Sequence, residues 1–321
     1  YLPGNIGNTA VGLRRILMST VVIRQNNKQQ TLLISPPMGM DQAIQAAGFS
    51  FPMPCGGHHT CGKCLVRASG QLSPRSPEEA LLCPEDPALR LACCAVIQGD
   101  AQIDLPDLPQ ADVLLNSDPI CMSSGEPVGF AVDIGTTTIA VYLYALQSGT
   151  QLAREGALNR QSIFGADVIA RIDAARQQPN LLQHSIVDQL DHMFSNCLLR
   201  CGLSHKQVKR LVITGNTTML HFLTGRDASG IAVSPFVPES LFGYSTDAGA
   251  LFPSFSGARL FLPRCISAYV GADIVCALLS CDLTGRYSKA LLVDVGTNGE
   301  MALWADGKLY CCSTAAGPAF E

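Results

Sequence analysis

The stretch Cys55-Gly-Gly-His-His-Thr-Cys61-Gly-Lys-Cys64 determines how the first part of the chain is interpreted. Its cysteines have the spacing C-x5-C-x2-C, and glycines stand at positions 56, 57 and 62. Glycine takes backbone conformations that other residues resist, so the main chain of such a loop can approach a metal closely. Its N–H groups can then point at the sulfur atoms of a cluster. The stretch therefore predicts a loop that wraps a small iron–sulfur cluster.

A cluster held by four thiolates needs one more cysteine from a distant part of the chain. Cys93, in the run Arg90-Leu-Ala-Cys93, follows after a 28-residue gap. This is close to the plant-type [2Fe–2S] spacing C-x4-C-x2-C with a remote cysteine, with one extra residue in the first gap. Cys83 is a weaker rival, and Cys94 is expected to point away from Cys93 because strand side chains alternate between faces. We predict a [2Fe–2S] cluster bound by Cys55, Cys61, Cys64 and Cys93.

Three other interpretations of this motif fit less well. A four-cysteine zinc site usually presents two C-x2-C pairs, whereas the second half here offers only Cys93-Cys94. A redox-active C-x-x-C motif would not need Cys55. A Rieske centre would replace two of the cysteines with histidines, but we expect His58 and His59 to be exposed loop residues.

The residues around this loop predict a β-grasp ferredoxin domain over 18–106, because hairpins, a helix and short strands follow one another. The expected elements are, in order, a hairpin (20–24 and 31–35), a helix (40–47), a strand (65–68) with a turn at Ser69-Gly70, a helical turn (77–82), and a hairpin (91–97 and 102–105) around Gly99-Asp100.

Composition excludes several classes of protein. Hydrophobic residues make up 47% of the 321 residues and charged residues 15%, so a large core can form. A net charge of −4 argues against a nucleic-acid-binding face. The longest apolar run, 128–146, is broken by Asp133 and Gly135, which argues against a membrane span. Fourteen cysteines without a secretory signal indicate thiols and metal ligands, so we expect a cytoplasmic protein.

The remaining boundaries come from local composition. Residues 1–17 show no strong pattern, and we expect a leader that is non-native or disordered. Prolines among Asp, Ser and Gly over 107–127 indicate a linker between domains. The second domain, 128–321, stops in the middle of a motif, so we expect it to be truncated at its C-terminus.

A supersecondary unit occurs twice in the second domain. Residues 130–144 predict two strands joined at Asp133-Ile-Gly-Thr-Thr-Thr138, with a further turn at Gly149. Residues 292–304 repeat the pattern with Asp294-Val-Gly-Thr-Asn298 and a further turn at Asp306-Gly307. One Asp-x-Gly-Thr turn is weak evidence, but its duplication in matching context indicates an internal repeat.

The chemistry of these turns suggests phosphate binding. Small residues let backbone N–H groups face an anion, threonine hydroxyls add donors, and an aspartate at a strand end can hold Mg²⁺. Two such turns that face each other could clamp the phosphate tail of a nucleotide. The alternative is two ordinary hairpins.

The sequence between the repeats is mixed α/β. We expect helices over 167–175 and 181–201, with Cys197 and Cys201 on the apolar face of the second. His184, Asp188 and His192 line another face of it, which a solvated polar surface explains better than a metal site. Strand 211–215 leads into a helix through Asn216 and Thr217, which could bind phosphate at the helix N-terminus or simply cap the helix. We expect another helix over 267–281, with Asp273 either in the cleft or capping a turn.

Seven motifs in this order resemble the reductive activators of corrinoid proteins, over residues from about 20 to 321. These activators fuse a ferredoxin to an actin-like ATPase domain of the ASKHA superfamily, which has a ribonuclease-H-like α/β fold. The motifs are the cysteine stretch 55–64, Arg-Leu-Ala-Cys (90–93), Val-Asp-Ile-Gly-Thr-Thr-Thr (132–138), Thr-Gly-Asn-Thr-Thr-Met (214–219), Tyr-Val-Gly-Ala-Asp (269–273), Asp-Val-Gly-Thr-Asn-Gly-Glu (294–300) and Ser-Thr-Ala-Ala-Gly-Pro-Ala-Phe-Glu (313–321).

The resemblance implies a function. Such activators use ATP, with Mg²⁺, to drive an electron from an external donor through the [2Fe–2S] cluster to a corrinoid protein, returning Co(II) to Co(I). It implies ligand roles for the four cysteines, catalytic roles for Asp133 and Asp294, and nucleotide contacts from two loops and the helix start. The implied nucleotide-binding residues are Gly135, Thr136, Thr137, Thr138, Asn216, Thr217, Gly296, Thr297 and Asn298.

The resemblance has two departures. The segment between ferredoxin and ATPase is shorter than in better-known members, and the adenine-binding part is absent. We therefore expect this chain to bind the cluster but to bind ATP weakly or not at all, and to lack ATPase activity by itself.

Two other functions stay open. One is a redox sensor, in which the ferredoxin gates a non-catalytic actin-like module that binds a partner. The other is a small-molecule kinase or amide hydrolase on the same fold, which would need a catalytic base in the cleft that the sequence does not single out.

Overall fold

The chain divides into two compact units. The structure, a computed structural model, describes residues 18–26, 28–49, 51, 53, 55–83, 86–106, 125–178, 180–296 and 298–315. The first unit comprises residues 1–50 and 64–107, and the second comprises residues 51–63 and 108–321. The segment 51–63, with Cys55 and Cys61, thus groups with the second unit. The predictions for the leader 1–17 and for 107–124 of the linker lie outside the described residues.

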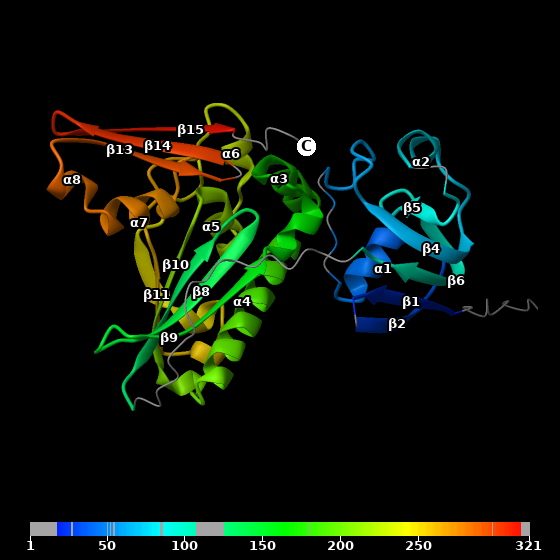
Figure 1. Cartoon of the computed structure of the whole chain (residues 1–321), viewed down its shortest axis with the longest axis horizontal. Helices are drawn as coiled ribbons and strands as arrows, with labels where there is room; N and C mark the ends of the chain where they lie inside the picture. The colour runs from blue at the N-terminus through cyan, green and yellow to red at the C-terminus, as the bar shows by residue number, and fades with distance from the viewer. Residues whose placement is uncertain are drawn as a thin grey trace, which may run out of the picture. The chain divides into compact units, whose positions relative to one another are not determined.

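The first unit is a mixed sheet with two helices (Figure 1). Its elements are β1 (Ser19–Gln25), β2 (Lys28–Ile34), β3 (Met38–Gly39), α1 (Met40–Ala46), β4 (Leu65–Leu72), α2 (Pro77–Leu82), β5 (Leu89–Leu91) and β6 (Val96–Asp104). The strands lie in the order β2-β1-β6-β4-β5, and β3 pairs with β6. Strands β1 and β6 are parallel and the other pairs are antiparallel. The β-grasp prediction is confirmed, including the first hairpin and both helices.

Alternating side chains give this sheet its buried face. Every second residue of β6 is buried from Ile97 to Ile103. Val21 and Ile23 of β1 are also fully buried, beside Met40 and Ile44. Since strand side chains alternate between faces, the exposed residues between them face away from this core.

Two predicted turns in this unit are wrong, because both stretches lie within strands. Ser69-Gly70 belongs to β4, where Gly70 has φ +110° and the register shifts between Gly70 and Leu72. This is a bulge, for which glycine supplies the positive φ. Gly99-Asp100 belongs to β6, which pairs with β1 on one side and β4 on the other. Pairing along both edges outweighs the local turn preference of Gly-Asp.

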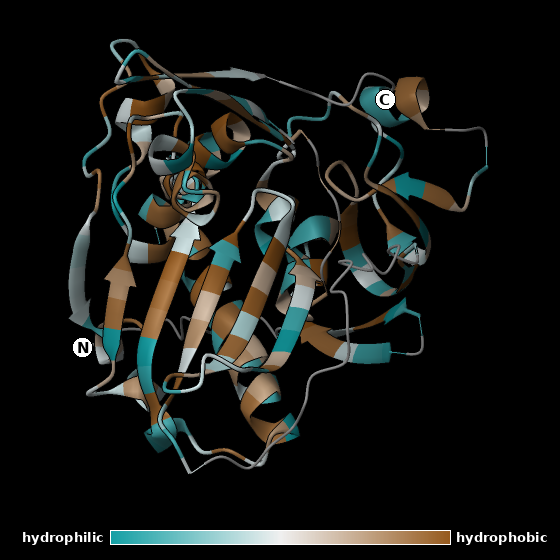
Figure 2. Cartoon of the chain, turned by 60° about the vertical axis from the view of Figure 1, so that its left-hand side comes forward, coloured by the Kyte–Doolittle hydropathy of each residue, from teal (hydrophilic) through white to brown (hydrophobic). Residues whose placement is uncertain are grey.

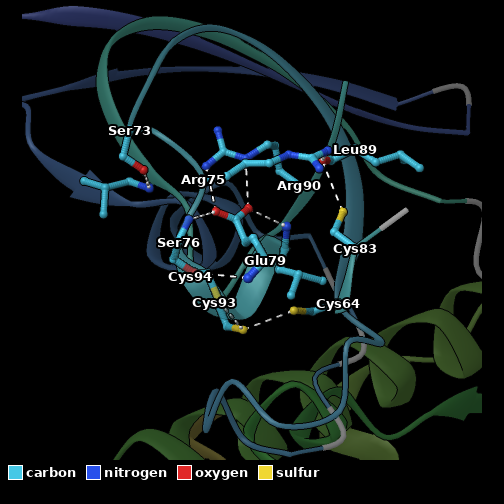
Figure 3. Close-up of polar contacts among 12 residues, drawn as sticks. Cys64, Ser73, Arg75, Ser76, Glu79, Cys83, Leu89, Arg90, Cys93 and Cys94 are labelled. Carbon is cyan, nitrogen blue, oxygen red and sulfur yellow. Dashed lines mark hydrogen bonds and ion pairs between the residues drawn. The ribbon is translucent and has the colours of Figure 1, made fainter. Parts of the chain in front are cut away.

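A buried ion pair joins α2 to β5 (Figure 3). Arg90 donates from Nε and Nη2 to the two carboxylate oxygens of Glu79, at 2.8 and 2.9 Å. The Leu91 N–H donates to the same carboxylate at 3.0 Å, and Ser76 forms a capping box with it. Glu79 is 0% exposed and Arg90 5%, so removing either charge would leave the other buried without an oppositely charged partner. The pair fixes β5, the strand that leads to Cys93.

The second unit contains the remaining elements. Its strands are β7 (Val128–Ile134), β8 (Thr138–Ala145), β9 (Gln151–Leu158), β10 (Val208–Gly215), β11 (Tyr244–Asp247), β12 (Arg259–Leu262), β13 (Lys289–Val295), β14 (Asn298–Ala305) and β15 (Lys308–Ala315). Its α-helices are α3 (Val168–Gln177), α4 (Leu181–Arg200), α5 (Thr217–Thr224), α6 (Ser229–Ala232), α7 (Ala272–Ser280) and α8 (Leu283–Arg286). Short 3₁₀ segments are η1 (Arg160–Phe164), η2 (His205–Gln207), η3 (Ala248–Ala250) and η4 (Pro253–Phe255).

The main sheet of this unit has the order β11-β12-β10-β7-β8-β9. Strands β7, β8 and β9 form an antiparallel meander, whereas β10 runs parallel to both β7 and β12. Parallel neighbours need crossover connections, and α3 with α4, then α5, lie between these strands in the sequence. Hydrophobic residues line the strands and the helices packed against them (Figure 2). The rings of Phe130 and Phe194 are in contact. The predicted ASKHA-type α/β fold is confirmed.

The helices follow the sequence pattern with one correction. On α4, Cys197 is fully buried, whereas His184, Asp188 and His192 are exposed, in agreement with a solvated polar face. The helix predicted over 267–281 begins only at Ala272. The Ile266 N–H instead donates to the Val270 carbonyl, which closes a turn before the helix.

We predict that Glu79→Gln destabilises the first unit by about 3 kcal/mol at neutral pH, because it leaves the Arg90 charge buried and unpaired. Burial opposes ionisation of Glu79, but the hydrogen bonds from Arg90 and Leu91 lower its pKa below 4.5. Its contribution is therefore complete above pH 4.5 and disappears as pH falls through the lower folded-state pKa. The difference between variant and wild type should shrink in acid.

The measurement is hydrogen exchange of peptides from 64–106 in increasing urea, since the single tryptophan, Trp304, lies in β14 of the second unit. Glu78→Gln, on the exposed side of the same helical turn, is the matched control. Equal stability of the two variants would show that the buried pair does not hold this unit together.

Candidate functional site

Cys64 and Cys93 lie side by side in the first unit (Figure 3). Cys64 directly precedes β4, and Cys93 lies in the turn after β5. The Ala92 N–H donates to the Cys64 carbonyl at 2.9 Å, which brings the two segments together. Their Sγ atoms are 3.2 Å apart, with the Cys64 thiol donating. That hydrogen bond, together with burial, raises the pKa of Cys93.

The prediction that Cys94 points away from Cys93 is wrong. The Cys94 Sγ is 3.7 Å from the Cys93 Sγ, because both residues lie in a turn in which the Cys94 N–H donates to the Leu91 carbonyl. Strand alternation does not apply there. Cys83, the other rival, donates its thiol to the Leu89 carbonyl at 3.3 Å.

The other two predicted ligands, Cys55 and Cys61, lie together in the segment 51–63. Burial opposes ionisation of Cys55, but hydrogen bonds from the Thr60 backbone and from Cys61 lower its pKa to about 6. The Lys63 N–H donates to the Cys61 Sγ at 3.5 Å, the type of contact that tunes a metal–thiolate bond. A Cys55 thiolate at neutral pH is suited to metal binding.

The glycines of this segment have the conformations that the sequence predicts. Gly56, Gly57 and Gly62 all have positive φ, at +61°, +85° and +65°. His58 and His59 are exposed, as expected. Thiols held 3.2 Å apart repel each other once ionised, so the Cys64–Cys93 pair needs a bound cation to exist as thiolates. Each pair of cysteines, Cys55 with Cys61 and Cys64 with Cys93, offers thiolate donors of the kind that iron–sulfur clusters take.

The second candidate site is a cavity of about 430 Å³ within the second unit. It lies where the β7–β8 and β13–β14 turns, the start of α5 and the start of α7 converge. Its lining residues are Asp133, Gly135, Thr136, Thr137, Thr138, Asn216, Asp273, Asp294, Gly296, Asn298 and Glu300.

The two repeated turns are built alike. The Gly135 N–H donates to the Thr138 carbonyl at 2.9 Å, and the Gly296 N–H donates to the Asn298 carbonyl at 2.9 Å. Asp133 pairs with Ala140 across its hairpin, whereas Asp294 pairs with Glu300, so the second turn is one residue shorter. Each turn carries its aspartate at the end of a strand, as the internal repeat predicts.

Four carboxylates line the cavity, from Asp133, Asp273, Asp294 and Glu300. Water reaches Asp133 through the cavity, but the surrounding protein limits its hydration, and this burial together with the Asp294 charge raises its pKa. Burial and the other three carboxylates raise the pKa of Asp273 to about 7. Burial and the Asp294 charge also raise the pKa of Glu300. Mutual repulsion of this kind is relieved by a bound cation, and carboxylates are ligands that Mg²⁺ prefers.

The predicted residues at the start of α5 divide between two roles. Asn216 caps the helix through Oδ1, which accepts from the Met219 N–H at 2.9 Å, and its Nδ2 donates to the Thr136 hydroxyl at 3.0 Å. It therefore both caps α5 and contacts the first turn. Thr217 is fully buried, and its hydroxyl donates to the Ser267 carbonyl at 2.6 Å. Thr217 is not among the residues that line the cavity, so it is not one of the proposed nucleotide contacts. Thr297, the other predicted contact, lies outside the described residues.

The sequence left Asp273 between a place in the cleft and a turn cap, and it gave no role to Glu300; both residues line the cavity. Asp273 follows Gly271, the N-cap of α7, and occupies the first turn of that helix. Glu300 lies two residues after Asn298 on β14, so strand periodicity places both side chains on one face. This two-residue spacing from a predicted phosphate turn is the sequence signal that could have identified Glu300.

Comparison with known families accounts for most of the chain. Residues 23–98 match the 2Fe-2S iron-sulfur cluster binding domain, residues 128–286 the RACo middle region, and residues 288–321 the C-terminal domain of RACo, the ASKHA domain. The three matches follow one another in the order that the motifs predict. The chain belongs to the family of reductive activators of corrinoid proteins.

Individual reductive activators show how far the likeness extends. The corrinoid activation enzyme RamQ of Eubacterium limosum is 34% identical over 203 residues, covering 60% of this chain and 33% of RamQ. A [Co(II) methylated amine-specific corrinoid protein] reductase of Methanosarcina barkeri is 26% identical over 205 residues, covering 60% of this chain and 37% of that protein. The chain thus spans about a third of the length of these curated relatives.

A solved structure of a reductive activator for corrinoid, iron-sulfur protein has a similar fold, with a TM-score of 0.58 and 24% identity. The likeness covers 94% of this chain and 64% of that one. It supports the arrangement of a ferredoxin followed by an ASKHA-type domain.

We predict that Cys93→Ser abolishes the cluster and that Cys94→Ser retains it. Anaerobically prepared wild-type protein should contain about two irons and two sulfides per chain and give a reduced-state EPR signal. Cys94→Ser is a demanding control, because its Sγ is only 3.7 Å from that of Cys93. A cluster retained in Cys93→Ser and lost in Cys94→Ser would reverse the ligand assignment.

Proposed function

We propose that this chain contributes an electron-carrying cluster and phosphate-binding turns to the ATP-dependent reductive activation of a corrinoid protein, which returns Co(II) to Co(I) by transfer of one electron. One observation carries the proposal: a single chain combines a cysteine set suited to a [2Fe–2S] cluster with a carboxylate-lined cavity between two repeated Asp-x-Gly-Thr turns. The curated relatives are named as a corrinoid activation enzyme and a corrinoid-protein reductase, which supports the same chemistry.

In this proposal Cys55, Cys61, Cys64 and Cys93 hold the cluster. A bound [2Fe–2S] cluster supplies one-electron transfer between an external donor and the cobalt of the partner protein. The hydrogen bond from the Lys63 N–H to the Cys61 Sγ would stabilise negative charge on that sulfur. Cys94 is not one of the proposed ligands, although its Sγ lies 3.7 Å from that of Cys93.

The cavity would hold the phosphates of ATP and a Mg²⁺ ion. Asp133 and Asp294 end equivalent strands on opposite repeats, so each would orient the cation or its water molecules. The backbone of the two turns, with the Thr136–Thr138 hydroxyls and Asn216, would contact the phosphates. Asp273 and Glu300 add negative charge that a divalent cation would offset.

The partners and compartment follow from this chemistry. The chain would meet a corrinoid protein and an external electron donor. None of the described helices is long and apolar enough to cross a membrane. We propose the cytoplasm as the chain's compartment, because thiols stay reduced there.

The test is the rate of Co(I) formation from a Co(II) corrinoid protein, with a chemical reductant and with or without Mg–ATP. It uses the longest natural chain that contains this sequence. ATP should accelerate the reaction, and Asp133→Asn should reduce that acceleration at least ~10-fold by weakening the cation site. Cys93→Ser should remove the reaction with and without ATP.

Asp188→Asn on the exposed face of α4 provides the same carboxylate-to-amide change away from the cavity, and it should behave as wild type. Co(I) formation that is indifferent to ATP would contradict the proposal. Redox-dependent binding of a partner without nucleotide turnover would instead favour a sensor.

A further inference from the structure

A fully buried asparagine lies directly behind the first phosphate turn. Asn159 follows β9 and is 0% exposed. Its Nδ2 donates to the Gly135 carbonyl at 2.9 Å, and its backbone N–H donates to the Thr137 carbonyl at 2.8 Å. One residue therefore binds two carbonyl oxygens of a turn whose other side lines the cavity.

The position of Asn159 is itself held on several sides. Its Oδ1 accepts from the Gln161 N–H at 3.0 Å, which caps η1. The Gln189 side chain, from α4, binds both neighbours of Asn159. Its Nε2 donates to the Leu158 carbonyl at 2.7 Å, and its Oε1 accepts from the Arg160 N–H at 2.8 Å. The asparagine is thus anchored to the meander and to α4.

Burial makes this arrangement specific. An amide that is out of contact with water must satisfy its donors and acceptors within the protein. Exchanging the Asn159 amide for a group without a donor would leave the Gly135 carbonyl unpaired. The Asn159 Nδ2 also lies 3.7 Å from the Met219 Sδ on α5, the helix that Asn216 caps. The asparagine therefore contacts two of the elements that line the cavity.

The chemical consequence concerns phosphate. Carbonyl oxygens repel phosphate oxygens, so a turn that binds phosphate must keep its carbonyls away from the anion and offer donors to it. The two carbonyls that Asn159 binds are those of Gly135 and Thr137, which both line the cavity.

We propose that Asn159 is the positioning residue of the first phosphate turn, holding those two carbonyls toward the protein so that the turn accepts the triphosphate tail of a nucleotide. The inference rests on the proposed nucleotide function. Asn159 does not touch the phosphates in this account; it acts through the turn.

The decisive comparison is Asn159→Asp against Gln161→Glu, because each change replaces an amide donor with a carboxyl group. Gln161 is also 0% exposed and its Nε2 donates to the Leu182 carbonyl at 2.8 Å, away from the turn. The two variants thus make the same chemical change in one buried network, but only one of them touches the turn. Asn159→Ala, which has no side-chain donor at any pH, is the second test variant.

The first measurement is hydrogen exchange of peptides covering 133–140 without nucleotide. Asn159→Asp and Asn159→Ala should exchange about tenfold faster there than wild type, as expected when a buried carbonyl loses its hydrogen-bond donor. Gln161→Glu should leave this region unchanged while lowering the unfolding temperature. Unchanged exchange in the Asn159 variants would overturn the inference whatever the nucleotide does.

The second measurement is the affinity for Mg–ATP, on the longest natural chain that contains this sequence. We expect the Asn159 variants to bind about tenfold more weakly, with Gln161→Glu close to wild type. If wild type binds and the Asn159 variants bind equally well, the inference fails and the proposed function stands. If wild type does not bind Mg–ATP, the proposed function fails, and the assignment of this turn to phosphate fails with it.

Discussion

Mutual repulsion among four carboxylates is the constraint on which the second unit depends. Asp133, Asp273, Asp294 and Glu300 line one cavity, and the strands and helix that carry them are separated widely in the sequence. Bringing like charges together destabilises the folded state, and a bound counter-ion would offset that cost. Burial raises the pKa of Asp273 to about 7, and the charges of Asp133, Glu300 and Asp294 add to this shift. In the proposed function, the two repeated hairpins hold the cation and the phosphates between them.

The cysteine motif obeys the same logic with softer donors. The Cys64 and Cys93 sulfurs are brought within 3.2 Å by β4 and by the turn after β5, and the Glu79–Arg90 pair fixes that strand. The pKa of Cys55 is lowered to about 6, so its thiol is ionised at neutral pH. Anionic groups gather in each case where a metal would neutralise them. The hard carboxylates suit Mg²⁺, and the thiolates suit an iron–sulfur cluster.

Much of this could be predicted from the sequence, because both motifs are local. Cysteine spacing and Asp-x-Gly-Thr turns depend on residues close together in the chain, and so do the helix caps. Long-range pairing was harder to foresee. Gly99-Asp100 has the composition of a turn but continues β6, because β1 and β4 pair with it on both sides. Cys94 lies beside Cys93 because a turn replaces the expected strand. Asn159 carries no motif, and its role depends on β9 pairing with β8.

The proposed function therefore requires that the repeated turns form a cation site. The direct measurement is titration of Mn²⁺ into the protein, followed by the EPR signal of free Mn²⁺. We predict one Mn²⁺ bound per chain in wild type, and loss of that binding when Asp133 and Asp294 are both changed to asparagine. Equal Mn²⁺ binding by the wild-type and doubly substituted proteins, or no binding by either, would contradict the central claim that the two hairpins build a metal-dependent phosphate site.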